Sequence, residues 1–469
     1  MALITRTSVF LICLICLSGA GSSLSGNENE AGKNWNNFRG PTGNGMSTTA
    51  KPPTEWTSDK NVKWKIEIPG RGSSSPVVWG NKIFLTTAVN AEPNAKRPPQ
   101  MTRSDFIRQF DENKNGQLER EEIKKARAFQ KEQTAKSLAK HQFTVMCIDR
   151  EDGKILWQDV ANEKKPGESH HRDHGFATAS PLTDGMHVYF HFGPNGMFCY
   201  DLDGKQVWKR TDLGEMETRG NFGAGSSLAL DGDVLVMPWD HEGQSRIEAF
   251  NAKTGETIWK TERDEPSNWA TPRIVEVNGK KQVVHAGDLY SRGYDLADGK
   301  ELWRSSGLSS RPVATPIVKG NIGFFASSRQ GSVLDAYYLD REGDISGESA
   351  WSINDKTPDC PSMLLSDNRL FFIAANRGIV SCANADDGSL FFGAQRLPTI
   401  ESVYSSPVAA NGKVFITGRQ GNTVVIKDGN DYEIVAENNV GEPVDATLAL
   451  MENQIFIRGS KHLFCIEEE

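Results

Sequence analysis

Short apolar runs separated by turn residues recur from about residue 61 to the end of the chain. One recurring phrase is a small residue, then Ser or Thr, often Pro, and then an apolar run. It occurs at residues 74–78, 179–182, 270–274, 314–318 and 405–408. Weaker copies begin at Ser226, Cys360 and Ala446, so the phrase occurs eight times. This recurrence predicts a repeat protein with eight similar units.

A second phrase closes most units. It consists of Asp or Asn, a turn that contains Gly, an apolar residue and Trp, and it stands at 149–157, 201–208, 251–259 and 295–303. Trp351 ends a variant of the phrase. Phe391-Phe392 and Ile434-Val435 take the place of Trp in the next two units.

Each unit holds four short segments, with pairs such as Asp184-Gly185 and Asn411-Gly412 between them. Asn, Asp and Gly tolerate the positive φ of tight hairpin turns, so the segments predict antiparallel strands. The clean phrases at Ala270 and Ala314 begin 44 residues apart, a spacing typical of propeller blades. The sequence therefore predicts an all-β fold: an eight-bladed β-propeller of four-stranded antiparallel blades over residues 61–469.

The last unit stops at Glu469, after its third strand. Residues 62–68, which include Trp64, have the pattern of a fourth strand and stand before any unit has begun. We expect this N-terminal strand to close the last blade, because closure covers an otherwise exposed strand edge.

The Trp phrase resembles the tryptophan-docking motif of propellers of the pyrroloquinoline-quinone (PQQ) type, and it is best kept at 251–259 and 295–303. The head of the chain reads Asn34-Trp35-Asn36-Asn37-Phe38-Arg39-Gly40-Pro41 and then Gly43-Asn44-Gly45. This head is similar to that of exported bacterial proteins called PQQ-like or BamB-like repeat proteins. The resemblance implies that each Trp packs between neighbouring blades.

The same resemblance brings in the quinone-dependent dehydrogenases. They are usually longer, often carry two adjacent cysteines, and hold calcium beside the cofactor with a fixed set of Glu, Asn and Asp. No two cysteines are adjacent in this chain, so we do not expect PQQ to be bound.

Residues 90–141 interrupt the first unit between its second and third strands, and residues 100–140 predict an EF-hand helix–loop–helix. Its calcium ligands would be Asp111, Asn113, Asn115, Gln117 through the backbone carbonyl, Glu119 directly or through water, and Glu122 with two oxygens. Gly116 permits the sharp turn at the sixth position. The pattern predicts Ca²⁺ binding, and an acidic turn that binds nothing is the alternative.

Three charged ligands predict a modest affinity, about 10⁻⁴–10⁻³ M. EF-hands usually pair, and this chain has one such loop. Leu118 and Phe106 therefore need a cover from the propeller or from a second chain. A structural or docking role is favoured over a sensor role.

Residues 1–20 predict a secretory signal peptide: Arg6, an apolar run at 9–17 and the small residues Ser18-Gly19-Ala20. An uncleaved anchor is the alternative, although the run is short for a bilayer. Residues 21–60 form an N-terminal extension whose order the sequence does not indicate. We expect an exported protein, periplasmic or extracellular, with no membrane span in the mature chain.

Export permits disulfides, and five cysteines follow the signal peptide, an odd number. Four of them, Cys147, Cys199, Cys382 and Cys465, occupy a slot that holds Ala249 or Gly293 in other units. A slot that accepts Cys, Ala or Gly predicts tight packing and buried free thiols. A disulfide or a reactive thiol is the alternative.

The loop before the second unit carries His170-His171-Arg172-Asp173-His174. Such a cluster suits a transition metal or acid–base chemistry, and a solvated loop is the alternative. Residues just before the first strands should share one mouth of the ring with it: Arg71, Arg219, Asn221, Asn268, Trp269, Arg311, Asp359, Tyr404 and Asp445. The candidate ligand site comprises Arg71, His171, His174, Arg219, Asn221, Trp269, Arg311 and Tyr404, which suit an anionic or sugar-like ligand.

The formal net charge is −8, which argues against nucleic acid as a partner. We therefore predict an exported, calcium-binding propeller that acts as a binding or scaffold protein in the cell envelope, for an unknown protein or small-molecule ligand. No catalytic residue is assigned. The alternative is a quinone- or metal-dependent oxidoreductase that uses the channel mouth.

Overall fold

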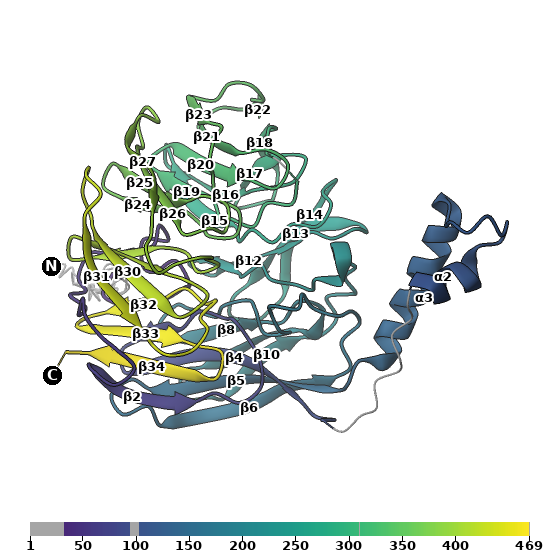
Figure 1. Cartoon of the computed structure of the whole chain (residues 1–469), viewed down its shortest axis with the longest axis horizontal. Helices are drawn as coiled ribbons and strands as arrows, with labels where there is room; N and C mark the ends of the chain where they lie inside the picture. The colour runs from purple at the N-terminus through teal and green to yellow at the C-terminus, as the bar shows by residue number, and fades with distance from the viewer. Residues whose placement is uncertain (1–31, 94–102, 309, 469) are drawn as a thin grey trace, which may run out of the picture.

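The computed structural model describes residues 32–93, 103–308 and 310–468. Eight sheets, each built on four antiparallel strands, surround a central channel (Figure 1). The innermost strands of neighbouring sheets contact one another, as β3 does with β7 on one side and β32 on the other. The predicted all-β, eight-bladed propeller is confirmed.

The first four blades contain the following strands in order from the channel outward. They are β3 (Val77–Trp79), β4 (Lys82–Asn90), β5 (His141–Asp149) and β6 (Ile155–Lys164); β7 (Leu182–Thr183), β8 (His187–His191), β9 (Met197–Asp201) and β10 (Gln206–Arg210); β11 (Ala229–Asp231), β12 (Val234–Trp239), β13 (Ser245–Asn251) and β14 (Thr257–Arg263); and β15 (Arg273–Val277), β16 (Lys280–His285), β17 (Ser291–Asp295) and β18 (Glu301–Ser305).

The other four blades follow the same order. They are β19 (Ile317–Lys319), β20 (Ile322–Ser327), β21 (Val333–Tyr338) and β23 (Trp351–Ile353); β24 (Leu364–Ser366), β25 (Arg369–Ile373), β26 (Ile379–Asn384) and β27 (Leu390–Arg396); β28 (Val408–Ala410), β29 (Lys413–Thr417), β30 (Asn422–Lys427) and β31 (Ile434–Asn439); and β32 (Ala449–Met451), β33 (Gln454–Arg458), β34 (His462–Glu467) and β2 (Val62–Glu67). Two short strands add to these sheets in parallel: β22 (Gly343–Asp344) beside β18, and β1 (Met46–Ser47) beside β28.

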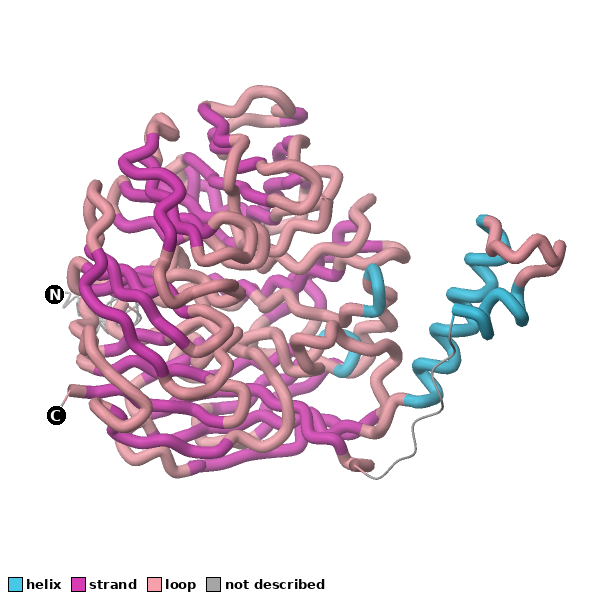
Figure 2. The backbone as a smooth tube through the Cα atoms, in the orientation of Figure 1, coloured by secondary structure: helices cyan, strands magenta, loops and turns pink. Residues whose placement is uncertain are grey.

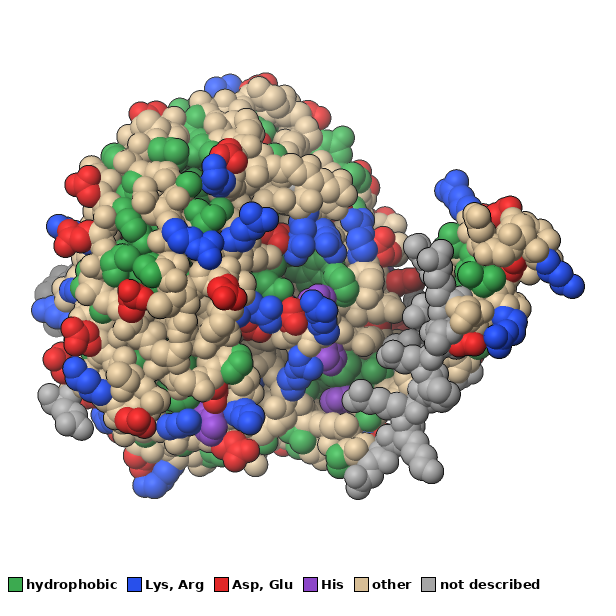
Figure 3. Space-filling model, in the orientation of Figure 1, with side chains coloured by type: hydrophobic (Ala, Val, Ile, Leu, Met, Phe, Trp, Pro, Cys, Tyr) green, Lys and Arg blue, Asp and Glu red, His purple; other side chains and the backbone are tan. Residues whose placement is uncertain are grey.

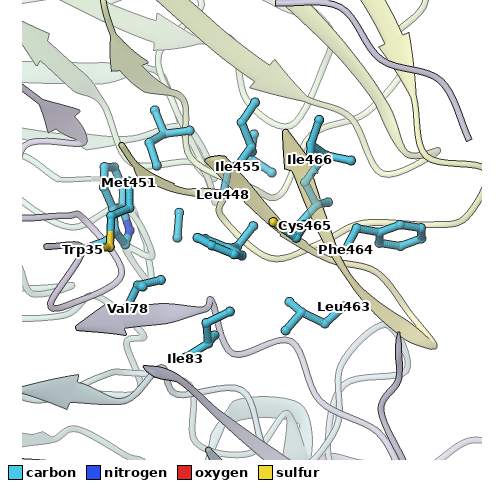
Figure 4. Packing of buried hydrophobic residues seen from close by; sticks show 14 of the residues in the cluster. Trp35, Val78, Ile83, Leu448, Met451, Ile455, Leu463, Phe464, Cys465 and Ile466 are labelled. Carbon is cyan, nitrogen blue, oxygen red and sulfur yellow. The ribbon is translucent and has the colours of Figure 1, made fainter. Parts of the chain in front are cut away.

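The ring closes where the N-terminal strand β2 pairs antiparallel with β34, as the sequence predicts. Trp64 lies opposite Cys465 in this pair, just as Trp157 lies opposite Cys147 in the first blade. Buried residues of the first and last blades pack together at the joint, and Trp35 from the N-terminal segment lies among them (Figure 4). Burial of this apolar surface stabilises the closed ring.

In the described part of the chain, five docking Trp residues each connect a blade to the next, whereas Trp303 donates to Gln282 of its own blade. The indole Nε1 of Trp157 donates a hydrogen bond to the carbonyl of Leu202 at 3.0 Å, and Trp208 does the same to Ala252 at 2.8 Å. The ring of Trp157 lies so close to Gly204 of the following turn that a Cβ there would come within 2.7 Å of it. The Gly of the second phrase is therefore the surface on which the preceding Trp docks.

The slot that holds Cys, Ala or Gly lies directly opposite the Trp of the same blade. Ala249 pairs with Trp259, and Gly293 pairs with Trp303. The slot cysteines are buried and free, as predicted, and Cys360 is free as well. Burial raises the pKa of each slot thiol, to about 12 for Cys147, so these thiols remain protonated and act as small apolar groups.

One assignment from the sequence is wrong. Ile434 and Val435 do not replace the Trp of the seventh unit, because both are exposed on the outer strand. The register places Ala436 opposite Val425 at that position. The eighth blade offers no glycine turn there, since its outer strand is β2. Trp56 from the N-terminal segment is buried in the same cluster as Val425 and stacks on Phe415 at 6.4 Å.

The insertion leaves the first blade between Asn90 and His141, which pair with each other. It contains α2 (Arg103–Phe110) and α3 (Arg120–Ser137), which pack through Phe110 and Phe129 with ring centroids 5.4 Å apart. The hairpin projects from the propeller, and its joining loop lies at the end away from the blades (Figure 2). The side chain of Phe106 and the predicted signal peptide lie outside the described residues. No helix in the described ranges is long and apolar enough to cross a membrane.

The tight slot predicts the effect of Gly293→Ala. The new Cβ would lie 2.1 Å from Nε1 of Trp303 and would disturb its hydrogen bond to Gln282. Overpacking of this kind lowers the free energy of unfolding by about 1–3 kcal/mol. Denaturant unfolding of both proteins measures the difference. Gly429→Ala is the matched control, because the nearest atom to its new Cβ is a Lys427 side-chain carbon at 3.8 Å. Equal stability of the two variants would contradict the packing argument.

Candidate functional site

The repeated Ser or Thr of the first phrase builds a closed ring of hydrogen bonds around the channel. In each blade the backbone N–H of this residue donates to the hydroxyl of its counterpart in the next blade. The bonds run from Ser75 to Ser180 (2.8 Å), Ser180 to Ser227 (2.9 Å), Ser227 to Thr271 (2.9 Å), Thr271 to Thr315 (3.4 Å), Thr315 to Ser362 (3.0 Å), Ser362 to Ser406 (2.9 Å), Ser406 to Thr447 (3.0 Å) and Thr447 to Ser75 (3.0 Å). All eight residues are buried. We call these eight side chains the hydroxyl belt.

The belt corrects the alignment of the sixth repeat. Its belt residue is Ser362, so the phrase there begins at Pro361 and not at Cys360. The displaced Cys360 lines the channel instead. Burial raises the pKa of its thiol to about 12.

The hydroxyl belt surrounds a cavity of about 210 Å³ inside the channel. Figure 3 shows Lys, Arg and His side chains gathered around a hollow near the centre of the visible face. Phe38 is the one residue of the N-terminal segment that lines the cavity.

Residues 34–47 cross the end of the channel opposite the mouth and bind to the ends of the inner strands. Trp35 pairs with Val78 of the first blade, and the carbonyl of Asn36 accepts from Thr183 of the second. The guanidinium of Arg39 donates to the carbonyls of Met363 (2.6 Å) and Pro407 (3.2 Å) in the sixth and seventh blades. The segment thus closes this end, and the cavity is a blind pocket.

Five of the predicted ligand-site residues line this pocket: His171, His174, Trp269, Arg311 and Tyr404. They come from the connections into the second, fourth, fifth and seventh blades. These connections meet at one mouth because every inner strand begins at the same end of its blade. The structure thus places these five residues around one cavity.

The other three lie outside the pocket lining. Arg71 is exposed and donates to the carbonyl of Arg172. Arg219 is held by Glu242 at 3.3 Å and Asp288 at 3.5 Å. Asn221 has a positive φ of 55° and borders a shallow depression beside His171. Asn268, also expected at the mouth, is buried against Asp240.

The charges around the pocket fall into two groups. Arg419 pairs with Asp445 at 2.7 Å and with Asp173 at 3.3 Å, and it lies over the ring of Tyr404, 4.0 Å from the centroid. On the other side Arg329 pairs with Asp359 at 2.8 Å. Arg311 makes no ion pair with a carboxylate in the described part of the chain. Its pKa is lowered chiefly by burial and then by the neighbouring Arg329, while Asp359 acts in the opposite direction.

Of the three histidines of the 170–174 cluster, His171 and His174 lie near each other, with ring centroids 5.5 Å apart, whereas His170 turns to Phe176. The ring of His170 packs on Phe176 at 4.6 Å, that of His171 on Phe222 at 4.7 Å, and His174 lies near Tyr404. No group of three or more His, Cys, Asp and Glu side chains in the described ranges is placed to hold a metal ion. Burial lowers the pKa of His171 and of His174, so both rings are neutral at pH 7.

The pocket also contains residues that the sequence did not single out. Phe222 and Arg329 line it together with Cys360 and Phe38. Arg329 lies between β20 and β21, and loops from the second to the third strand share the mouth end with the connections into the first strands. This topological rule would have pointed to Arg329 and Arg419. Phe38 reaches the pocket because the N-terminal segment crosses the channel, and the repeat pattern does not predict this crossing.

The loop between α2 and α3 turns its acidic side chains inward. Asp111 accepts hydrogen bonds from the backbone N–H groups of Asn115 (3.1 Å) and Gly116 (2.7 Å). Glu122 accepts from those of Glu112 (2.8 Å) and Glu119 (2.9 Å). These bonds lower the pKa of Glu122 and favour its charged form.

The amides of Asn113 and Asn115 both donate to Glu119, at 3.0 and 3.1 Å. Their side-chain carbonyl oxygens accept backbone N–H groups of the loop. The side chains of Asp111, Asn113, Asn115, Glu119 and Glu122 therefore lie around one short loop, although in the described residues its three carboxylates do not form a group placed to hold a metal ion.

The closed ring of blades, the docking Trp residues and the repeated phrase define a repeat propeller of the PQQ-like class. Residues 141–392, more than half of the chain, match the family described as outer membrane protein assembly factor BamB, so the chain belongs to this family. No curated protein matches the chain.

Two solved structures show the shared architecture. BamB from Moraxella catarrhalis is 14% identical with a TM-score of 0.50, over 70% of this chain and 89% of that chain. A quinohemoprotein alcohol dehydrogenase from Comamonas testosteroni is 10% identical with a TM-score of 0.55, over 95% of this chain and 85% of that chain. Likeness at such low identity shows the fold alone.

The hydroxyl belt predicts the effect of Ser362→Ala. The variant leaves the buried N–H of Thr315 without its acceptor. An unsatisfied buried donor costs about 1–3 kcal/mol, so the free energy of unfolding should fall by that amount. Ser362→Thr keeps a hydroxyl at the same place and should restore most of the loss. Denaturant unfolding compares the three proteins, and an unchanged Ser362→Ala variant would show that the ring does not stabilise the fold.

Proposed function

We propose that the protein is an exported binding or scaffold protein of the cell envelope that binds Ca²⁺ through residues 111–122 and a ligand or partner through its propeller. The observation that carries the calcium part is the inward arrangement of Asp111 and Glu122. Both carboxylates are held by backbone N–H groups of the loop, and Glu122 is only 6% exposed. Ca²⁺ prefers carboxylate and carbonyl oxygens of this kind as ligands.

The ligand set would be Asp111, Asn113, Asn115, Glu119 and Glu122 with the carbonyl of Gln117. Amide and carbonyl oxygens make up half of it. Two of the amide nitrogens now donate to Glu119, so these side chains would turn their carbonyl oxygens toward the cation. The bound ion would fix the loop and the relative orientation of α2 and α3.

The scaffold part is supported by membership of the BamB family. A name that describes assembly at the outer membrane favours a place in the cell envelope and a protein partner. The signal-peptide pattern of residues 1–20 supports export. The insertion joins β4 to β5 at the mouth end of the first blade, so the hairpin and the pocket lie on the same side of the propeller.

An oxidoreductase is the second candidate, and the blind pocket with His174, Tyr404 and Cys360 is the observation that favours it. The residues present do not fit the quinone site that the family resemblance implies. The lining contains a single carboxylate, Asp445, which is paired with Arg419, and a single cysteine. We therefore place this candidate behind the binding protein.

Calorimetric titration of the mature protein with Ca²⁺ tests the calcium proposal. We expect one site with a dissociation constant of about 10⁻⁴–10⁻³ M and a rise in melting temperature. Asp111→Asn combined with Glu122→Gln should abolish both effects, because it removes two of the three charged ligands. Glu121→Gln is the matched control, since Glu121 is exposed beside the loop and holds no ligand position.

Each other outcome has a clear meaning. Absence of binding by the unaltered protein would refute the calcium proposal. Binding that survives in the double variant would place the ion elsewhere, and the oxidoreductase would then become the first candidate.

A further inference from the structure

The hydroxyl belt has a second chemical property besides closing the ring. A hydroxyl carries one donor and two acceptor positions. Each belt hydroxyl uses an acceptor position for the N–H of the preceding blade, and no described residue accepts its proton. The same holds for the other half of the ring. All eight side chains line the pocket, so the belt presents a circle of O–H donors to whatever lies inside it.

The charge above the belt has the matching sign. Arg311 lines the pocket without a carboxylate partner in the described ranges, and Arg329 beside it shares the only close one, Asp359. The carboxylate of Asp445 also lines the pocket, but it accepts from Arg419 at 2.7 and 3.3 Å. A cation would meet the unpaired Arg311, whereas an anion would compensate its charge.

Aromatic rings form part of the remaining lining. Phe222 lies beneath the guanidinium of Arg311, 5.7 Å from its ring centroid, and Trp269 and Tyr404 complete the wall. An apolar or aromatic body would pack against these rings while its acceptor oxygens reach the belt. The mouth residues suggested either an anionic or a sugar-like ligand. A neutral sugar-like ligand would leave the charge of Arg311 uncompensated, so the charge favours the anionic class.

We infer that the pocket binds a small molecule through an oxyanion group, a carboxylate or a tetrahedral phosphate or sulfate, which accepts hydrogen bonds from the hydroxyl belt beneath Arg311. This inference rests on the proposed function in taking the channel pocket as the ligand site. The cavity of about 210 Å³ limits the ligand to a small molecule or to the end of a larger one.

Calorimetry in calcium-free buffer with four probes tests the inference. The probes are benzoate, its uncharged counterpart benzamide, inorganic phosphate and sulfate. We expect benzoate or one of the inorganic anions to bind and benzamide to bind at least about tenfold more weakly, the scale of a hydrogen bond to a charged group. Preference for benzoate identifies a carboxylate with an apolar body, and preference for phosphate or sulfate identifies a tetrahedral group.

Two variants measure separately what a belt hydroxyl and the mouth residue Arg311 contribute to anion binding. Thr315→Val removes one belt hydroxyl with little change of shape, and its ring bond, 3.4 Å from Thr271, is the longest of the eight, so the cost to folding is least there. Arg311→Gln removes the unpaired charge. Each should weaken binding of the preferred anion by about tenfold. Thr315→Ser should restore the affinity, and Arg341→Gln, an exposed arginine paired with Glu348, should leave it unchanged.

Thermal melts confirm that each variant is folded. Equal binding of benzoate and benzamide would overturn the inference while leaving the pocket as a ligand site. Loss with Arg311→Gln but not with Thr315→Val would also overturn it, because the anion would then bind at the mouth only. Failure of all three anions to bind would overturn it too. Calcium titration reports on the proposed function independently of these results.

Discussion

The structure depends on a buried hydrogen-bond ring that no single blade can form. Each inner strand begins with a backbone N–H that points along the circumference of the channel, where no strand pairing is available to satisfy it. A buried donor without an acceptor is costly, so each blade needs its neighbour to bring an oxygen to that point. A short hydroxyl side chain meets this need, and this explains why Ser or Thr recurs where the apolar pattern would otherwise place Ala or Val. The ring of bonds is complete only when the eighth blade meets the first, where Thr447 donates to Ser75.

The Trp residues make a second, outer connection between the same neighbours. Trp157 and Trp208 reach over the glycine turn of the following blade and bond to its backbone. Inner and outer connections at different radii fix both the spacing and the tilt of adjacent blades. Neither connection involves the loop from the second to the third strand, where the insertion stands. The first blade can therefore carry a helical hairpin without loss of the ring.

The sequence predicted the fold well because its signals are local and repeated. The phrases at 251–259 and 295–303 each specify a turn, a docking surface and a ring within nine residues. The seventh unit was misread, since a larger Val425 opposite a smaller Ala436 reverses the usual sizes, and the compensating Trp56 is far away in sequence. The ion pairs at the mouth were likewise beyond prediction, because the partners of Arg329 and Arg419 depend on how loops from different blades meet.

The candidate site was predictable to the same extent. The periodicity of the sequence gives the start of each inner strand, and the residues just before these starts include His171, His174, Trp269, Arg311 and Tyr404. The donor character of the pocket cannot be predicted in this way, because it depends on which hydrogen bonds the repeated hydroxyls already make. From the sequence alone, a repeated Ser is classed as a small residue. Its O–H is recognised as a donor to the pocket only when the structure shows that a backbone N–H occupies its acceptor position.

The N-terminal segment has a consequence for the order of events during biosynthesis. Residues 34–47 bind the inner ends of the first, second, fifth, sixth and seventh blades, and β2 pairs only with β34 near the C-terminus. The first and second blades that this segment contacts are made early, whereas the fifth to seventh blades and β34 are made late. The pairing of β2 with β34 therefore waits for the last blade, so both segments must be present in one compartment before the ring can close.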